Sequence, residues 1–230
     1  MKIRALVCVA LLALAGCASQ NSRFAGREPI PRSEGAEEIW TRQLAKNKIG
    51  MDNWATIRAV RGNVEISGDQ GKTWNRPKVG VILKENQKIR TSDNSASDLY
   101  LGDNGPVVRL REDSSLGIIR LDRQKTDDRI TVDTMIDLEK GQIQGAVKKL
   151  SAESSYLVRT RAGVIQVRGT EFTATAEGAV SIISGTAVVY CNGKQFMVAA
   201  GQKYVPAGAA DPGDESVLEI PVSSEQVAAR

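Results

Sequence analysis

The amino-acid sequence predicts an all-β protein, a solenoid-like two-sheet sandwich of about a dozen short strands with one short N-terminal helix. From Trp54 to Val205, apolar and polar residues alternate in short runs, and turn-forming residues separate the runs. Helical spacing of apolar residues occurs ahead of this region and does not recur within it. Each predicted strand therefore buries one face against a second layer.

Residues 1–16 have the composition of a leader that is removed. Lys2 and Arg4 precede the uncharged run Ala5–Ala15, which is too short to span a bilayer as a helix. The run ends in Leu14–Cys17, which resembles the lipobox of bacterial lipoproteins, where small residues precede a cysteine. The resemblance implies that Cys17 carries a diacylglycerol and an amide-linked acyl chain, which together anchor the mature chain in a membrane. An ordinary secretory signal cut elsewhere is the alternative.

The residue after this cysteine is Ala18. In enteric lipoproteins an aspartate at this place favours retention in the inner membrane, so the resemblance implies attachment to the outer membrane, facing the periplasm. Loss of residues 1–16 lowers the formal charge from +4 to +2. A nearly neutral chain lacks the field that drives non-specific nucleic-acid binding, so no nucleic-acid partner is predicted.

The chain contains no histidine. This excludes serine and cysteine triads, histidine general bases and nearly all catalytic zinc sites. Asp127, Asp128, Asp133 and Asp137 leave a carboxylate-dependent glycoside hydrolase as a disfavoured alternative, since such enzymes need only a facing pair of carboxyl groups. Cys191 follows a β-branched run and is interpreted as a small buried hydrophobe. We therefore predict a protein that is not an enzyme and holds no cofactor or metal.

The segment between the leader and the β region has two parts. Residues 17–32 are polar, contain Gly and Pro, and are interpreted as a flexible tether. A short amphipathic helix is predicted at residues 33–50, where Ala36, Trp40 and Leu44 recur every four residues. Two interpretations of this stripe are open: packing on the β domain, or docking of a partner.

The predicted β domain spans residues 54–206, and residues 207–230 are interpreted as a linker and tail. One strand phase is expected to face the core at Ile130, Val132, Ile136 and Leu138. A similar three-residue pattern, in which a glycine opens a predicted strand, occurs three times, at Gly62–Val64, Gly141–Ile143 and Gly185–Ala187. The intervals are unequal, so no strict repeat is predicted.

The segment Val167–Phe172 places an arginine, a glycine and a threonine before a hydrophobic strand, shortly after the strand Tyr156–Thr160. This arrangement resembles the FecR-type domain, a periplasmic all-β module first known from an iron-citrate signalling regulator, and the likeness covers residues 55–206. Where the family has glycine and aspartate, this chain has Asn86 and Gln87. Asparagine tolerates positive φ, so the turn is expected to survive, whereas the polar role of the aspartate is left open.

The motif itself predicts a local distortion of the strand. Gly169 is expected to form a bulge that redirects Arg168 and Thr170, ahead of Glu171 and the hydrophobic Phe172. In the favoured interpretation, carbonyls or a carboxylate bind the Arg168 guanidinium and so lock two strands together.

A second interpretation gives the motif a ligand. Arg159, Arg161 and Arg168 are candidate contacts for an anionic group if they share a face, although Glu171 and Glu177 are expected to neutralise such a patch.

The tryptophans are candidate stacking platforms for sugar rings. Trp74 is the best placed because it follows a glycine-rich turn, ahead of Trp40 and Trp54, while core or interface packing is the commoner role for all three. Together these observations predict a non-catalytic, membrane-anchored module that binds an envelope protein in a signalling or scaffold role. The family's regulators signal to a cytoplasmic sigma factor through a membrane-spanning helix. No such helix is predicted in this sequence, so we expect any signalling role to lie outside the cytoplasm. A peptidoglycan- or polysaccharide-binding module is the rival hypothesis.

Overall fold

The fold is all-β with one short N-terminal helix, as the sequence predicts. The computed structural model describes residues 35–46, 51–52, 54–102, 107–126 and 129–206. They form helix α1 (Ala36–Ala45) and strands β1 (Met51–Asp52), β2 (Ala55–Arg61), β3 (Val64–Ser67), β4 (Ile82–Leu83), β5 (Lys88–Thr91), β6 (Ala96–Leu101), β7 (Val107–Leu110), β8 (Ser115–Thr126), β9 (Arg129–Lys140), β10 (Gln142–Ala146), β11 (Ser155–Arg159), β12 (Val164–Thr175), β13 (Val180–Cys191), β14 (Lys194–Ala199) and β15 (Lys203–Tyr204). No helix in the described ranges is long and apolar enough to cross a membrane.

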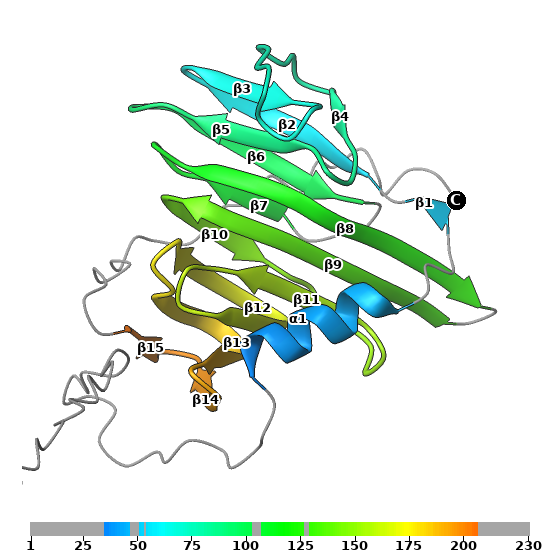
Figure 1. Ribbon diagram of the computed structural model, residues 1–230, viewed down its shortest axis with the longest axis vertical. Coiled ribbons are helices and arrows are strands. Elements are labelled where there is room, and N and C mark those ends of the chain that lie inside the picture. Colours follow the sequence, from blue (N-terminus) through cyan, green and yellow to red (C-terminus); the bar gives the residue numbers. More distant parts are fainter. Residues whose placement is uncertain (1–34, 47–50, 53, 103–106, 127–128, 207–230) are drawn as a thin grey trace, which may run out of the picture.

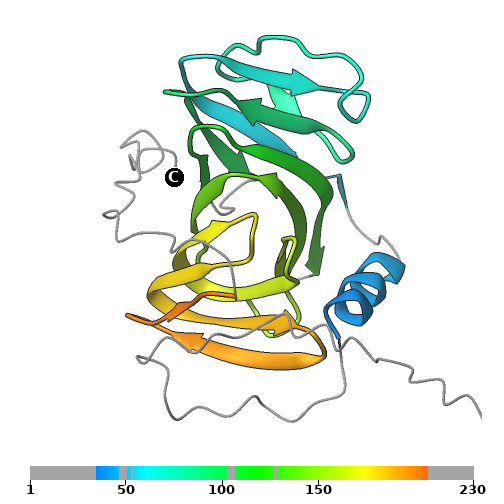
Figure 2. The same cartoon turned by 60° about the vertical axis from the view of Figure 1, so that its left-hand side comes forward.

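The two layers are the arms of one continuous sheet that curls over on itself (Figures 1 and 2). One arm has the order β3-β5-β8-β9-β11-β12, and the other continues as β12-β10-β7-β6-β2-β4. Strand β12 belongs to both arms, because its first half pairs with β11 and its second half with β10. Strand β13 follows β12 through both halves. The pairings are antiparallel except for β9 with β11, which is parallel.

The main core lies between the two arms. Ile89 and Ile136 come from one arm and Ile57 and Val108 from the other, and all four are fully buried in one cluster. Aliphatic side chains dominate this cluster, as expected from an aromatic content of 4%. The prediction for Cys191 is confirmed, since its side chain is buried in the same cluster.

Two of the three glycines that open strands, Gly62 and Gly141, form the same kind of turn. Gly62 and Gly141 both have positive φ, and a Cβ at either would meet a serine hydroxyl, that of Ser95 or Ser114. In each case the serine Oγ accepts the N–H of the residue after the glycine, at 2.8 Å for Asn63 and 2.9 Å for Gln142. The third position, Gly185, lies in a different kind of contact, against the backbone of Gly169.

Strand length departs from the prediction of uniformly short strands. Strands β8, β9, β12 and β13 have 12 residues each. Ile136 and Leu138 face the core as predicted, but Ile130, which the alternation places in the same phase, is exposed. The physical reason is that β11 pairs with β9 only from Asp133 to Asp137, so the start of β9 has only β8 beside it in the ladder.

The turn at Asn86 and Gln87 is formed as predicted. Asn86 has a φ of +65°, as predicted for an asparagine in a glycine position. The side-chain carbonyl of Gln87 accepts the backbone N–H of Lys84 at 3.0 Å. Glutamine therefore fills a polar role in this turn that the sequence left open.

Candidate functional site

The predicted motif lies where the sheet passes from one arm to the other. Gly169 has a φ of +64°, and the register of β12 against β13 shifts between Arg168 and Glu171. A Cβ at Gly169 would lie 2.8 Å from the Cα of Lys149. The predicted bulge is therefore present, and only glycine fits it without displacing the neighbouring backbone.

Thr170 and Phe172 hold this corner together. The buried Thr170 hydroxyl donates to the carbonyl of Thr186 at 2.7 Å, and the Thr170 backbone exchanges two hydrogen bonds of 2.9 Å with Val147. The ring of Phe172 packs in the main core where a Cβ at Gly145 would stand. Threonine, and not arginine, locks the strands at the motif.

The Arg168 side chain lies on the surface. It is exposed, and no described residue forms an ion pair or side-chain hydrogen bond with its guanidinium. The favoured expectation, that carbonyls or a carboxylate hold this guanidinium between strands, is wrong within the described part of the chain, because the corner is locked by Thr170.

Arg159 and Arg161 each have a carboxylate partner. Arg159 binds Asp137, with Nη2 at 2.7 Å from Oδ2, and its guanidinium lies 4.6 Å from the centre of the Trp40 ring. Arg161 binds Glu177 at 3.3 Å. Two of the three predicted arginines are therefore neutralised by carboxylates, and the predicted neutralisation by Glu177 is present.

Trp74 is half-buried and one face of its ring is occupied. The Arg90 guanidinium stacks at 4.0 Å from the ring centre, and Glu65 holds Arg90 in an ion pair of 2.7 Å. The indole N–H donates to the carbonyl of Gly71 at 3.0 Å. A stacking ligand could therefore not use the face that Arg90 covers.

A polar turn before Trp74 was missed by sequence reasoning. The Asp69 carboxylate accepts the N–H groups of Lys72 and Thr73 at 3.0 and 2.8 Å, the Thr73 hydroxyl at 2.7 Å and the Ser67 hydroxyl at 2.7 Å. These bonds, led by the Thr73 N–H, hold the pKa of Asp69 well below its usual range, so the carboxylate keeps them in more acid conditions than an ordinary aspartate would. The sequence signal that could have predicted this turn is an aspartate with a serine two residues before it and a threonine four residues after it.

The carboxylates considered for glycoside hydrolysis do not form a facing pair among the described residues. Asp133 and Asp137 lie four residues apart on β9, so about 13 Å separates their Cα atoms, against about 5 to 9.5 Å between glycosidase carboxyl groups. Asp133 accepts the Ser155 hydroxyl, and Asp137 binds Arg159. Asp127 and Asp128 lie outside the described residues, as does Cys17. The described ranges contain no cluster of three side chains suited to a metal.

Helix α1 packs on the outer face of the first arm (Figure 1). Its Ile39 and Trp40 are buried against Met135 of β9, Leu157 of β11 and Val164 of β12. The packing interpretation of the helix is therefore confirmed, although α1 covers residues 36–45 of the predicted 33–50 and Leu44 is exposed.

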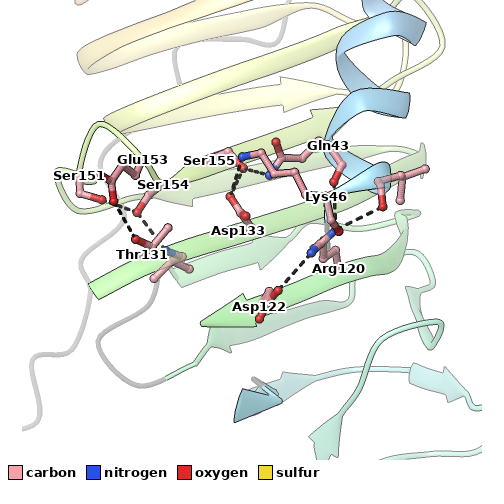
Figure 3. A network of polar contacts seen from close by, with 12 residues as sticks. Gln43, Lys46, Arg120, Asp122, Thr131, Asp133, Ser151, Glu153, Ser154 and Ser155 are labelled. Atoms are coloured by element: carbon pink, nitrogen blue, oxygen red, sulfur yellow. Dashed lines mark hydrogen bonds and ion pairs between the residues drawn. The ribbon is translucent and has the colours of Figure 1, made fainter. Parts of the chain in front are cut away.

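A buried polar network fixes the C-terminal end of α1 (Figure 3). The Arg120 guanidinium donates to the carbonyls of Gln43 and Lys46, both at 3.0 Å, and to the Asp122 carboxylate at 3.1 Å. A cation is the favourable partner for the unsatisfied carbonyls at a helix C-terminus. Sequence reasoning did not find this contact.

The same network continues towards β11. The Gln43 amide donates to the Ser155 hydroxyl at 2.7 Å, and this hydroxyl donates to Asp133 at 2.6 Å (Figure 3). Helix α1 is thus joined to the β body by both apolar and polar contacts.

The comparisons with known proteins give one family. Two solved structures, both of a proposed anti-sigma factor from Parabacteroides distasonis ATCC 8503, match with 21% and 18% sequence identity and TM-scores of 0.41 and 0.40. Each match covers 50% of this chain and 52% of the other, so the chain spans about half the length of these structures. A search of curated proteins found no match. Residues 87–188, from the turn before β5 to the middle of β13, match the family described as FecR protein, a narrower segment than the resemblance at residues 55–206.

Proposed function

We propose that this protein is a membrane-anchored lipoprotein of the bacterial envelope whose β body is a non-catalytic interaction module in signalling or scaffolding. The observation that carries the proposal is the FecR match over residues 87–188, which includes the corner at Gly169. Within that corner the glycine, threonine and phenylalanine are occupied in holding the fold, while Arg168 is left exposed for a partner.

The anchor in this proposal is the lipid on Cys17, in the outer membrane and facing the periplasm. The support for this anchor is the sequence of residues 1–17. Helix α1, which follows the proposed tether in sequence, is tied to the body by Trp40 and the Arg120 network.

The rival, a peptidoglycan- or polysaccharide-binding module, needs an open aromatic platform. Arg90 covers one face of Trp74, so a sugar ring could stack there only on the other face. A carboxylate-dependent hydrolase is disfavoured by the spacing of Asp133 and Asp137, by the hydrogen bond from Ser155 to Asp133 and by the ion pair of Asp137 with Arg159.

The test is photocrosslinking in intact cells from the full-length chain, with the photoreactive residue at Arg168, at Trp74, and at the exposed Lys194 of β14 as a control position. We expect a discrete protein adduct from Arg168 and none from Lys194. Capture of glycan from Trp74, together with retention of the protein on washed cell wall, would favour the rival. The absence of any adduct at Arg168 would contradict a partner at this corner.

A further inference from the structure

The connection between β3 and β4 lies at the end of the body away from α1 (Figures 1 and 2). Together with the adjoining start of β2, its side chains form a basic and apolar surface. We define the β3–β4 surface as residues 70–84 with Trp54. Residues 70–84 include four cations and no carboxylate. The four cations are Lys72, Arg76, Lys78 and Lys84. All four are exposed, and none forms an ion pair with a described residue.

Three large apolar side chains are exposed on the same surface. Val79 is 61% exposed, Ile82 51% and Trp54 40%. The values for Val79 and Ile82 are the two highest among the large hydrophobic residues described. Ile82 pairs with Thr56, while Ala55 and Leu83 point into the core. Because side chains alternate along a strand, Trp54 and Ile82 lie on the same outer face of β2 and β4.

Backbone hydrogen bonds hold this surface in place. The N–H of Gly80 donates to the carbonyl of Ile57 at 2.8 Å, and the N–H of Ile57 donates to the carbonyl of Val81 at 3.0 Å. Asn75 exchanges two backbone hydrogen bonds with Ile66, at 2.8 and 2.9 Å. The exposure of Val79 is therefore a property of a tight turn fixed to β2.

The nearest carboxylates in sequence are engaged elsewhere. Asp69 accepts the hydrogen bonds of its own turn, Glu65 binds Arg90, and Glu85 accepts the N–H of Leu121 at 2.8 Å. These carboxylates keep their charge, but residues 65–90 contain six cations against three carboxylates, a formal charge of +3, so the surface lies in a locally basic segment.

We propose that the β3–β4 surface binds a bilayer containing anionic phospholipid, with the cations on the headgroup phosphates and Val79, Ile82 and Trp54 in the interfacial layer. Basic residues beside exposed aliphatic and tryptophan side chains are the combination that peripheral membrane proteins use at this depth. The apolar side chains stand out from a turn and a sheet edge, which suits insertion into lipid. This contact is additional to the anchor at Cys17 and does not depend on it.

The test places a photoreactive residue at Val79 of the full-length protein, with Met197 of β14, 47% exposed, as the control position. The protein is reconstituted in vesicles of phosphatidylcholine alone and of phosphatidylcholine with phosphatidylglycerol. We expect phospholipid adducts at position 79 that increase with phosphatidylglycerol, and few at position 197 in either vesicle. The proposal is overturned if positions 79 and 197 give equal yields of phospholipid adduct, or if the yield at position 79 does not depend on phosphatidylglycerol.

Charge variants provide the second arm. Replacing Lys72, Arg76, Lys78 and Lys84 by glutamine is expected to lower the adduct yield at position 79 by about fivefold or more, since each surface cation contributes about fivefold to partition onto an anionic membrane. The control replaces four exposed lysines elsewhere by glutamine, at Lys125, Lys148, Lys149 and Lys194, and makes the same change in net charge. An equal loss in both variants would show an effect of net charge alone and would contradict the proposed surface.

The two proposals fail separately. If Cys17 carries no lipid, the dependence of the adduct at position 79 on phosphatidylglycerol is still expected. If that dependence is absent while Cys17 is lipidated, the anchor stands and the β3–β4 surface is refuted. A protein adduct in place of lipid from position 79 in native envelopes would also refute it.

Discussion

Replacing Gly169 by alanine is expected to lower the free energy of unfolding by about 3 kcal/mol or more. A φ of +64° costs a non-glycine residue about 1 kcal/mol or more, and a Cβ placed 2.8 Å from the Cα of Lys149 adds about 1 to 3 kcal/mol because the backbone must move. The measurement is the midpoint of urea denaturation, followed by circular dichroism.

Two variants separate the causes of this loss. Gly193 has a φ of +69°, and no atom lies within 4 Å of the place that a Cβ would take, so Gly193→Ala carries the backbone strain without the clash and is expected to cost about 1 kcal/mol. Arg168→Gln is expected to change stability by less than about 0.5 kcal/mol, because this side chain is exposed. If Gly169→Ala costs no more than Gly193→Ala, the packing of the corner against Lys149 is not as described.

Replacing Trp40 by alanine is expected to cost about 3 to 5 kcal/mol in the docking of α1. The side chain is 2% exposed, packs among Met135, Leu157 and Val164, and supports the guanidinium of Arg159. A ten-residue helix is marginal in water on its own, so loss of this contact is expected to release α1 while the sheet stays folded. Hydrogen exchange of the amides of residues 39–45 is the measurement, since they lose protection when the helix is released.

Leu44 provides the matched control on the same helix. It is 46% exposed, so Leu44→Ala is expected to leave the exchange of these amides within about 0.5 kcal/mol of the unchanged protein. Equal effects of the two substitutions would show that α1 is not held through its buried face.

The features that the sequence predicted correctly depend on local physical chemistry. A positive φ at Asn86 and the bulge at Gly169 follow from which residues tolerate the left-handed region. The all-β class follows from period two, and the burial of Trp40 follows from helical spacing. None of these required knowledge of which strands pair.

The features that were missed or wrong depend on pairing between distant strands. Arg159 has its carboxylate because β11 lies parallel to β9, which puts Arg159 opposite Asp137. Thr170 locks the corner because Thr186 of β13 lies beside it, and Arg168 is left outside. The pattern of residues in a single sequence does not show how these distant strands align with one another.

Arg120 was missed for a related reason. The register of β8 against β9 shifts between Ile118 and Arg120, so the strict alternation assumed along this strand is broken just before the arginine. The arginine then lies on the outer face, under the end of α1. An irregularity of this kind depends on the neighbouring strand and is not visible in the period of the apolar residues.

The central claim, that a lipid on Cys17 carries a non-catalytic β body in the envelope, is tested most directly by the mass of the N-terminal tryptic peptide of protein isolated from native membranes. The account predicts a peptide of residues 17–23 that begins at Cys17 and carries a diacylglycerol on sulfur and an acyl chain on nitrogen. A peptide that starts at another residue, or an unmodified Cys17, would contradict it.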